Sequence, residues 1–211
     1  MPLIRKPASP TTAVPEMQPD AAGTLRLLVA GDDDERWTAA RAAATLPGAV
    51  DALGAALQTE NNSRVREAMM TSLARIATAD SVRVLLPLIR SEDARVRAEA
   101  LDALTAMKEV AWPFLPGLLA DANADVRILA CELVRTLPGG EATDLLARSL
   151  DAESEPNVCA ALVEVLAAIG EPRALPALTR CEQRFAQEPF LAFSIRTAAD
   201  RIRTQSPGPR G

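Results

Sequence analysis

The sequence predicts an all-α protein, an α-α superhelix built from about six two-helix repeats, and three observations support this prediction. First, a helical pattern headed by valine recurs at Val65, Val96, Val126 and Val158, at intervals of 31, 30 and 32 residues. Second, 48% of the chain is hydrophobic but only 3% is aromatic, so small aliphatic side chains must fill the interior. Third, turn and cap residues recur between the helical segments. An all-helical repeat near 31 residues indicates stacked helix pairs.

The clearest copy of the pattern begins at Asp93, a candidate N-cap residue. Its apolar or small positions fall at i, i+4, i+7 and i+8, namely Val96, Ala100, Ala103 and Leu104. This spacing places them on one stripe of an α-helix. A helix with such a stripe needs a neighbour to bury it, which favours a stack.

The ends of the chain differ from its middle. Residues 1–20 carry five prolines and few large apolar side chains, so we expect a disordered, Pro-rich tail with polyproline II character. The segment from Pro7 to Pro10 has the form of an SH3-type ligand, but a plain disordered tail is the favoured interpretation. The repeat solenoid is expected over 21–203, followed by a disordered tail over 204–211.

The first repeat, over about 21–46, is rich in alanine around Trp37 and lacks the valine-headed pattern, as expected of a capping unit. Regular helix pairs are then predicted at 49–58 with 63–77, 80–91 with 94–107, 110–120 with 124–136, and 141–150 with 157–169. Pro87 lies too deep in its helix for a first turn, so we expect a bend or a later start there. The last pair, 173–186 with about 189–203, ends in arginines that suit a solvated C-terminal cap.

The pattern D-x-x-V-R-x-x-A-x-x-A-L resembles the HEAT-like repeat of the phycobilisome-lyase type, over about residues 21–203. In such repeats the arginine after the valine packs along the stack beside the aspartate that opens the helix. The resemblance therefore implies a ladder made by Arg66, Arg97 and Arg127 with Asp93 and Asp125 nearby. The fifth repeat has Cys159 in the arginine position, which interrupts the ladder. Because the contacts repeat, we expect a structural role for them rather than a catalytic one.

The composition excludes several classes of function. The chain has no histidine, so it cannot form a Ser-His-Asp or Cys-His nucleophile or a His-ligated metal site. The HEAT-like di-iron hydroxylases rely on His-Glu pairs and are excluded for the same reason. No phosphate-binding glycine motif occurs. We therefore expect no enzyme activity, no catalytic or metal-binding residues and no cofactor.

Charge and cysteine usage bear on partners and location. The net charge of −5 gives no broad basic surface, so no nucleic-acid partner is expected. The three cysteines form no CxxC pair and indicate small buried residues in a reducing compartment. No apolar run approaches the ~20 residues of a membrane span, and prolines interrupt the N-terminal region where a secretory core would lie. A cytoplasmic protein without membrane contact is the expectation.

The resemblance implies that the second helix of each pair lines the concave side of the superhelix. Counting from the valine, position five forms an apolar column made of Met70, Leu101, Cys131 and Val163. Position six forms a mostly acidic column made of Thr71, Asp102, Glu132 and Glu164. The apolar column is either buried by the next repeat or available to a partner. The acidic column lies off the core stripe, so it is either a solvated face or a surface that attracts a basic partner.

Two functional hypotheses follow. The first is a non-enzymatic protein-protein interaction scaffold that binds a basic or amphipathic segment of a partner along these columns. The alternative, suggested by the resemblance, is an accessory factor that handles a tetrapyrrole such as a bilin or haem. A tetrapyrrole needs cations for its propionates and aromatic walls for its ring, and this chain offers arginine but few aromatic residues.

Overall fold

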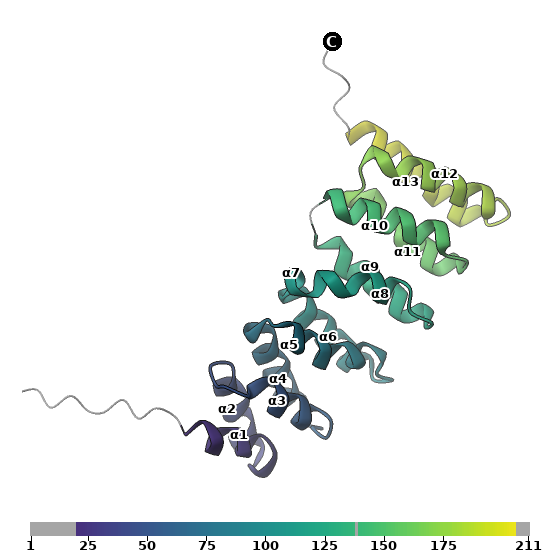
Figure 1. Cartoon of the computed structure of the whole chain (residues 1–211). Helices are drawn as coiled ribbons and strands as arrows, with labels where there is room; N and C mark the ends of the chain where they lie inside the picture. Colours follow the sequence, from purple (N-terminus) through teal and green to yellow (C-terminus); the bar gives the residue numbers. More distant parts are fainter. Residues whose placement is uncertain (1–19, 138, 206–211) are drawn as a thin grey trace, which may run out of the picture.

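The computed structural model describes residues 20–137 and 139–205, which form helices, turns and no strand. The helices stack as successive two-helix layers from one end of the molecule to the other (Figure 1). The predicted all-α superhelix is therefore confirmed. The proposed tails at 1–19 and 206–211, and Pro138 in the break before the fifth pair, lie outside the described residues.

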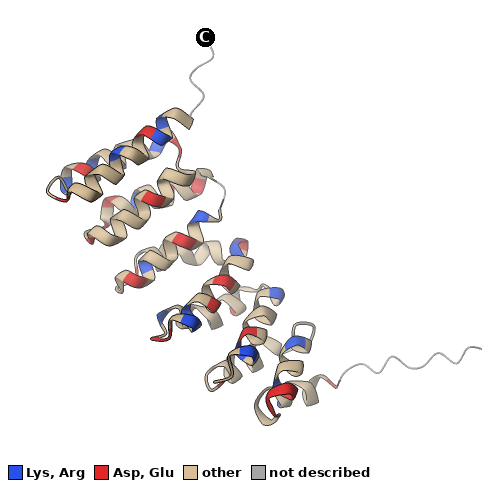
Figure 2. Cartoon of the chain, turned by 180° about the vertical axis from the view of Figure 1, so that it is seen from behind, with Lys and Arg blue, Asp and Glu red and all other residues tan. Residues whose placement is uncertain are grey.

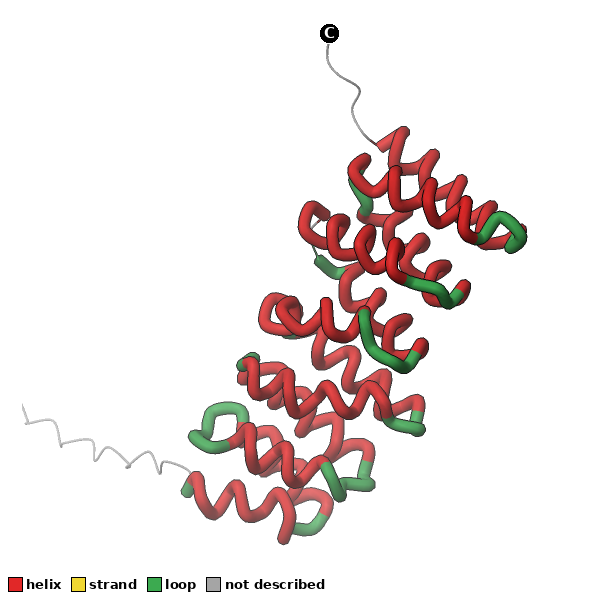
Figure 3. The backbone as a smooth tube through the Cα atoms, turned by 45° about the vertical axis from the view of Figure 1, so that its right-hand side comes forward, coloured by secondary structure: helices red, strands yellow, loops and turns green. Residues whose placement is uncertain are grey.

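Each layer pairs a first helix with a second helix, and the described residues form six layers. The first helices are α1 (Ala21–Ala30), α3 (Ala49–Leu57), α5 (Ala79–Leu85) with η1 (Leu86–Arg90), α7 (Lys108–Ala111) with η2 (Trp112–Phe114) and α8 (Leu115–Leu119), α10 (Gly139–Ala152), and η3 (Pro172–Ala174) with α12 (Leu175–Arg184). The second helices are α2 (Asp33–Ala43), α4 (Ser63–Ile76), α6 (Ala94–Ala106), α9 (Ala124–Arg135), α11 (Pro156–Ile169) and α13 (Pro189–Gln205). Loops lie along the edges of this stack (Figure 3). Helix α13 continues past the predicted end of the solenoid at 203.

Prolines change the first helices where the sequence places them. Pro87 follows the end of α-helical geometry in the first helix of its layer, where α5 gives way to the tighter 3-10 turn η1. Proline lacks the N–H that an α-helix interior requires, so the segment continues as a 3-10 turn. The alternative of a later helix start is wrong, because α5 begins at Ala79. The predicted single helix 110–120 is wrong, since Pro113 and Pro116 divide that segment into α7, η2 and α8.

The core is a continuous column of small aliphatic side chains between the layers. The pattern valines Val65, Val126 and Val158 are buried, and each second helix touches the next along the chain. Ala40, Ala100 and Ala130 are fully buried, and such small side chains let neighbouring helices approach closely. With the exception of α6 and α9, neighbouring second helices pack more extensively than neighbouring first helices do. Closer packing in one row is what the concave side of a curved stack requires.

The turn between the two helices of a layer is built in the same way in layers two to five. A side chain five positions before the pattern valine accepts a hydrogen bond from the backbone N–H two residues further on. These side chains are Glu60, Ser91, Asp121 and Glu153, at distances of 2.7, 3.2, 2.9 and 2.9 Å. In layers two to four the residue that donates this N–H also caps the second helix through its side chain, and Asp93 does so through the backbone N–H of Arg95, as predicted.

The close approach of α2 and α4 leads to a prediction. Ala40 is fully buried there, and its carbonyl accepts a hydrogen bond of 2.7 Å from Ser72 Oγ. We expect Ala40→Leu to lower the free energy of unfolding by about 1–3 kcal/mol, because the added volume has no space between the helices. Urea denaturation followed by circular dichroism measures the change.

The matched control is Ala98→Leu on the exposed side of α6, where the same side chain is added in solvent. Alanine and leucine both favour helices, so this control should shift stability by less than about 0.5 kcal/mol. Equal effects of the two substitutions would contradict close packing at Ala40.

Candidate protein-binding surface

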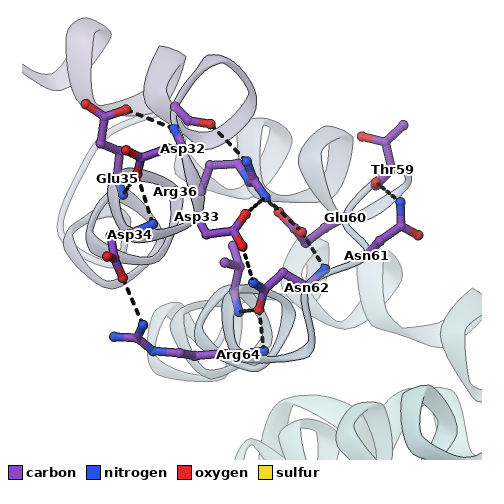
Figure 4. A network of polar contacts seen from close by, with 12 residues as sticks. Asp32, Asp33, Asp34, Glu35, Arg36, Thr59, Glu60, Asn61, Asn62 and Arg64 are labelled. Atoms are coloured by element: carbon purple, nitrogen blue, oxygen red, sulfur yellow. Dashed lines mark hydrogen bonds and ion pairs between the residues drawn. The ribbon is translucent and has the colours of Figure 1, made fainter.

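An ion-pair ladder joins successive layers along the edge that carries the turns. Arg36 Nε lies 2.7 Å from Glu60 Oε2 in the next layer, and Arg127 Nε lies 2.7 Å from Glu153 Oε2. Both arginines also donate to backbone carbonyls of their own turn. Figure 4 shows the first of these sites, where Arg36 reaches from α2 toward Glu60 in the turn before α4. The carboxylates are almost inaccessible, with side chains 4% and 6% exposed, so the pairs hold the layers in register.

The ladder differs from the expected contacts with Asp93 and Asp125. Arg66 pairs with Glu99 at 2.7 Å, while the carboxylate of Asp93 accepts the backbone N–H that opens α6. Asp93 is therefore occupied as a cap, although its charge helps Glu99 to raise the pKa of Arg66. Asp125 lies exposed within the first turn of α9, because Asn123 takes the cap position.

Two layers replace the interlayer pair by other contacts. Arg97 donates to the carbonyls of Ser91 and Glu92 at 2.7 and 3.0 Å, while Asp121 of the next layer pairs with Arg90 instead. In the fifth layer the carbonyl of Glu153 accepts a hydrogen bond from Arg184 of α12. Cys159 stands in the arginine position of this layer, so the ladder is interrupted there, as expected. Even so, every buried polar side-chain atom of the described residues has a hydrogen-bond partner.

The apolar column predicted at position five lies mainly in the core. Met70, Cys131 and Val163 are buried at 2%, 0% and 1% exposure, and Leu101 is half-buried. Of the two alternatives for this column, burial in the core therefore applies to these three, although Val163 also lines a groove between α11 and α13. Burial also raises the pKa of the Cys131 thiol to about 12, with further contributions from Glu132 and Glu153. All three cysteines are free and buried, which confirms their predicted packing role.

The acidic column predicted at position six reaches solvent. Thr71, Asp102 and Glu164 are exposed, and Glu132 is half-buried. Arg135 lies between Glu132 and Glu164, with nitrogen atoms 3.0 Å from Glu132 Oε2 and 3.0 Å from Glu164 Oε1. These pairs raise the pKa of Arg135 and neutralise part of the column. Asp102 forms no ion pair or side-chain hydrogen bond within the described residues.

Two grooves open between neighbouring second helices, one near each end of the stack. We call the outward side of these helices the second-helix face. A groove of about 480 Å³ between α2 and α4 is lined by Trp37, Arg41, Arg64, Glu67, Ala68, Thr71, Ser72 and Arg75. A groove of about 450 Å³ between α11 and α13 contains Val163, Glu164, Phe193 and Arg201 among its lining residues. Basic and acidic residues are distributed along the whole stack and do not form one broad basic surface (Figure 2).

Of the residues that line the first groove, Thr71 is predicted from the sequence as a contact residue, and the others are not. The first repeat lacks the valine that marks the other layers, so the sequence pattern indicates only a capping role for it. A usable signal was present, because Trp37 and Arg41 are four residues apart and therefore lie on one face of a helix. Their juxtaposition with Arg64 and Arg75, from the following layer, could not be read from that spacing.

The sequence matches the family described as HEAT repeats over residues 21–105 and 111–184. The chain belongs to the HEAT-repeat family. The predicted resemblance is therefore confirmed for the repeat type and for the fold. A comparison with curated proteins gives no match.

Several solved structures are similar in fold to this HEAT-repeat chain. An archaeal HEAT-like repeats protein from Thermococcus onnurineus NA1 is 14% identical, with a TM-score of 0.51 and 87% of each chain covered. Human deoxyhypusine hydroxylase is 16% identical, with a TM-score of 0.41, covering 88% of this chain and 96% of that one. The complex of CpcE and CpcF of phycocyanin lyase from Nostoc sp. PCC7120 is 17% identical, with a TM-score of 0.37, covering 96% and 100%. These similarities concern the fold alone.

Two further structural findings concern metal binding and membrane-spanning helices in this HEAT-repeat protein. Among residues 20–137 and 139–205, no group of three or more Cys, Asp or Glu side chains is placed to hold a metal ion. Within the same residues, no helix has both the length and the apolar character needed to cross a membrane. The charged side chains along the turn edge are paired with one another in the ladder. The second-helix face, which carries the two grooves, is therefore the candidate protein-binding site.

The ladder leads to a prediction about pH. Burial raises the pKa of Glu153, but hydrogen bonds from Arg127 and from the N–H groups of Glu155 and Ser154 outweigh it, so the pKa lies below 4.5. A carboxylate with a lowered pKa in the folded chain contributes stability above its unfolded pKa. That contribution is lost as the pH falls below about 4.5 toward the folded value.

We expect Glu153→Gln to destabilise the protein by about 2 kcal/mol at pH 7, because Arg127 loses its charged partner. The difference from the natural sequence should shrink as the pH falls below about 4.5, because the unfolded carboxylate has the higher pKa and protonation then favours the unfolded chain. Thermal unfolding across pH 3–7 measures this, with Glu141→Gln as an exposed control. A destabilisation independent of pH would contradict a charged ladder at this layer.

Proposed function

We propose that this HEAT-repeat protein is a non-enzymatic scaffold that binds an extended segment of a partner protein along its second-helix face. The observation that carries the proposal is a set of side chains on this face whose charge or apolar surface is left without a partner of opposite charge or a core contact. Asp102 and Arg41 form no ion pair within the described residues, and Phe193 is 65% exposed at the rim of the α11–α13 groove. Grooves between parallel helices can accept side chains of an extended segment.

The chemistry of the middle of the face favours a partner with basic residues there. The charge of Asp102 is free, and Glu164 is 70% exposed although it contacts Arg135. A lysine or arginine of a partner could pair with Asp102 and share Glu164 with Arg135. Such exposed pairs steer association and select partners more than they add affinity.

The absence of an enzyme activity is part of the proposal. Cysteine catalysis needs an activated thiol that a substrate can reach. A hydrogen bond with Cys159 lowers the pKa of Cys181, but this thiol is buried, and burial raises the pKa of Cys131. The three buried, unpaired thiols suit a reducing compartment, so the cytoplasm is the proposed location.

A tetrapyrrole-handling role is the alternative to a protein-binding scaffold. The α2–α4 groove combines arginines with one indole, whereas a large flat ring requires aromatic walls on more than one side. Absorbance spectra of the purified chain with biliverdin or haem test this alternative. A shifted and intensified visible band at equimolar pigment would support it, and an unchanged pigment spectrum would reject it.

The scaffold proposal predicts that the acidic column is needed for partner capture. We expect the triple variant Asp102→Lys, Glu132→Lys, Glu164→Lys to retain its fold but lose partners that the natural sequence captures, because like charges then repel a basic segment. Affinity purification with mass spectrometry, quantified against the natural chain, measures the loss.

The matched control reverses three exposed acidic residues on the first helices, Asp51→Lys, Glu109→Lys and Glu141→Lys. It changes the net charge equally but lies away from the second-helix face. Circular dichroism confirms that both variants are folded. Partner capture that is unchanged in the first variant, or equally reduced in both, would contradict binding through the acidic column.

A further inference from the structure

The α2–α4 groove is mainly basic, in contrast to the acidic column in the middle of the face. Its lining holds three arginines and one glutamate, whereas the chain as a whole carries a net charge of −5. Arg41 and Arg64 both lie over the ring of Trp37, with guanidinium carbons 4.7 and 4.3 Å from its centroid. A guanidinium held over an aromatic ring keeps its N–H edge free to bind a carboxylate.

The fold does not use all of this positive charge. Arg41 and Arg75 are exposed and form no hydrogen bond or ion pair within the described residues. Each lies in the last turn of its helix, where a positive charge is modestly favourable. That effect explains one arginine at each helix end, but it does not explain why they meet with Trp37 in one groove.

Arg64 already shows how a carboxylate is held at this site. Its Nη1 lies 2.9 Å from Asp34 Oδ1 of the preceding layer, and Figure 4 shows the pair at the edge of the polar network. Both side chains are exposed, at 58% and 84%. An exposed pair of this kind is weak, so an incoming carboxylate can replace Asp34 at little cost.

We propose that the α2–α4 groove binds an acidic segment of a partner protein. The inference rests on the proposed scaffold function and names the partner chemistry at this end of the face. Arg64 and Arg75 lie near opposite ends of α4, about 16 Å apart along the helix axis. An extended peptide covers that distance with about five residues, which places carboxylates on both arginines and a small or apolar side chain over Trp37.

A protein segment fits this groove better than a nucleic acid. A single-stranded nucleic acid could stack a base on Trp37, but its phosphates would continue along a face that carries Asp102, Glu132 and Glu164. A peptide can change its charge from acidic to basic along its length and so match both parts of the face.

The test uses fluorescein-labelled peptides of alternating Glu-Ala, Gln-Ala and Lys-Ala, together with a labelled oligouridine, and measures fluorescence anisotropy with the full chain. We expect the Glu-Ala peptide to bind about tenfold or more tightly than the other two peptides at low salt. Arg41→Glu with Arg75→Glu should weaken this binding about tenfold or more, because both free guanidinium groups are replaced by carboxylates.

Two further variants make the test specific. Asp34→Asn removes the resident carboxylate from Arg64 and should strengthen binding of the Glu-Ala peptide by about twofold or more. Arg26→Glu with Arg148→Glu, two exposed arginines on first helices, carries the same charge change as the double variant and should bind nearly as the natural chain does.

Several outcomes would overturn the inference. These are equal binding of the Glu-Ala and Gln-Ala peptides, no effect of the Arg41 and Arg75 substitutions, or oligouridine binding tighter than the peptide at the same arginines. The double variant also enters the partner-capture experiment. Partners that are still captured, together with no binding of the acidic peptide to the natural chain, would overturn the groove inference and leave the scaffold proposal standing.

Discussion

The structure depends on the burial of each helix pair by its neighbours. A two-helix layer leaves the apolar stripe of its second helix uncovered, and only the next layer can cover it. Val65, Val126 and Val158 are all buried at such interfaces. Alanine rather than aromatic side chains fills the space between layers, so the layers lie close together. This constraint explains why the chain repeats at an interval near 31 residues and why the two end layers depart from the pattern.

Burial alone does not fix how one layer is rotated on the next, and the polar contacts at the turn edge supply that information. Carboxylates such as Glu60 and Glu153 do two things at once: they close their own turn and accept an arginine from the preceding layer. Because the partners are nearly buried, a shift of one layer would leave charges without partners, and such a state is strongly disfavoured. The ladder is therefore a device for register, which is consistent with its recurrence along the chain.

Because the turn edge serves register, the second-helix face remains available for the proposed partner. Several side chains on this face lie outside the core. Among the described residues, Asp102 and Arg41 form no ion pair, and Phe193 is exposed. The face is also divided by charge, with arginines around Trp37 near one end and carboxylates on α6, α9 and α11. A partner that lies along it would have to match this order of charge, which provides selectivity without a deep pocket.

The sequence by itself determined the fold class, the number of layers and the limits on chemistry. The valine-headed stripes can only be buried by stacking, and the absence of histidine removes whole classes of active site. The tertiary structure alone decided which acidic residue each arginine contacts, that Met70, Cys131 and Val163 are covered, and that Trp37 meets Arg64 across two layers. The reason is physical: a repeat period fixes which stripe is apolar, but the offset and rotation between helices decide which side chains meet at the edges of that stripe.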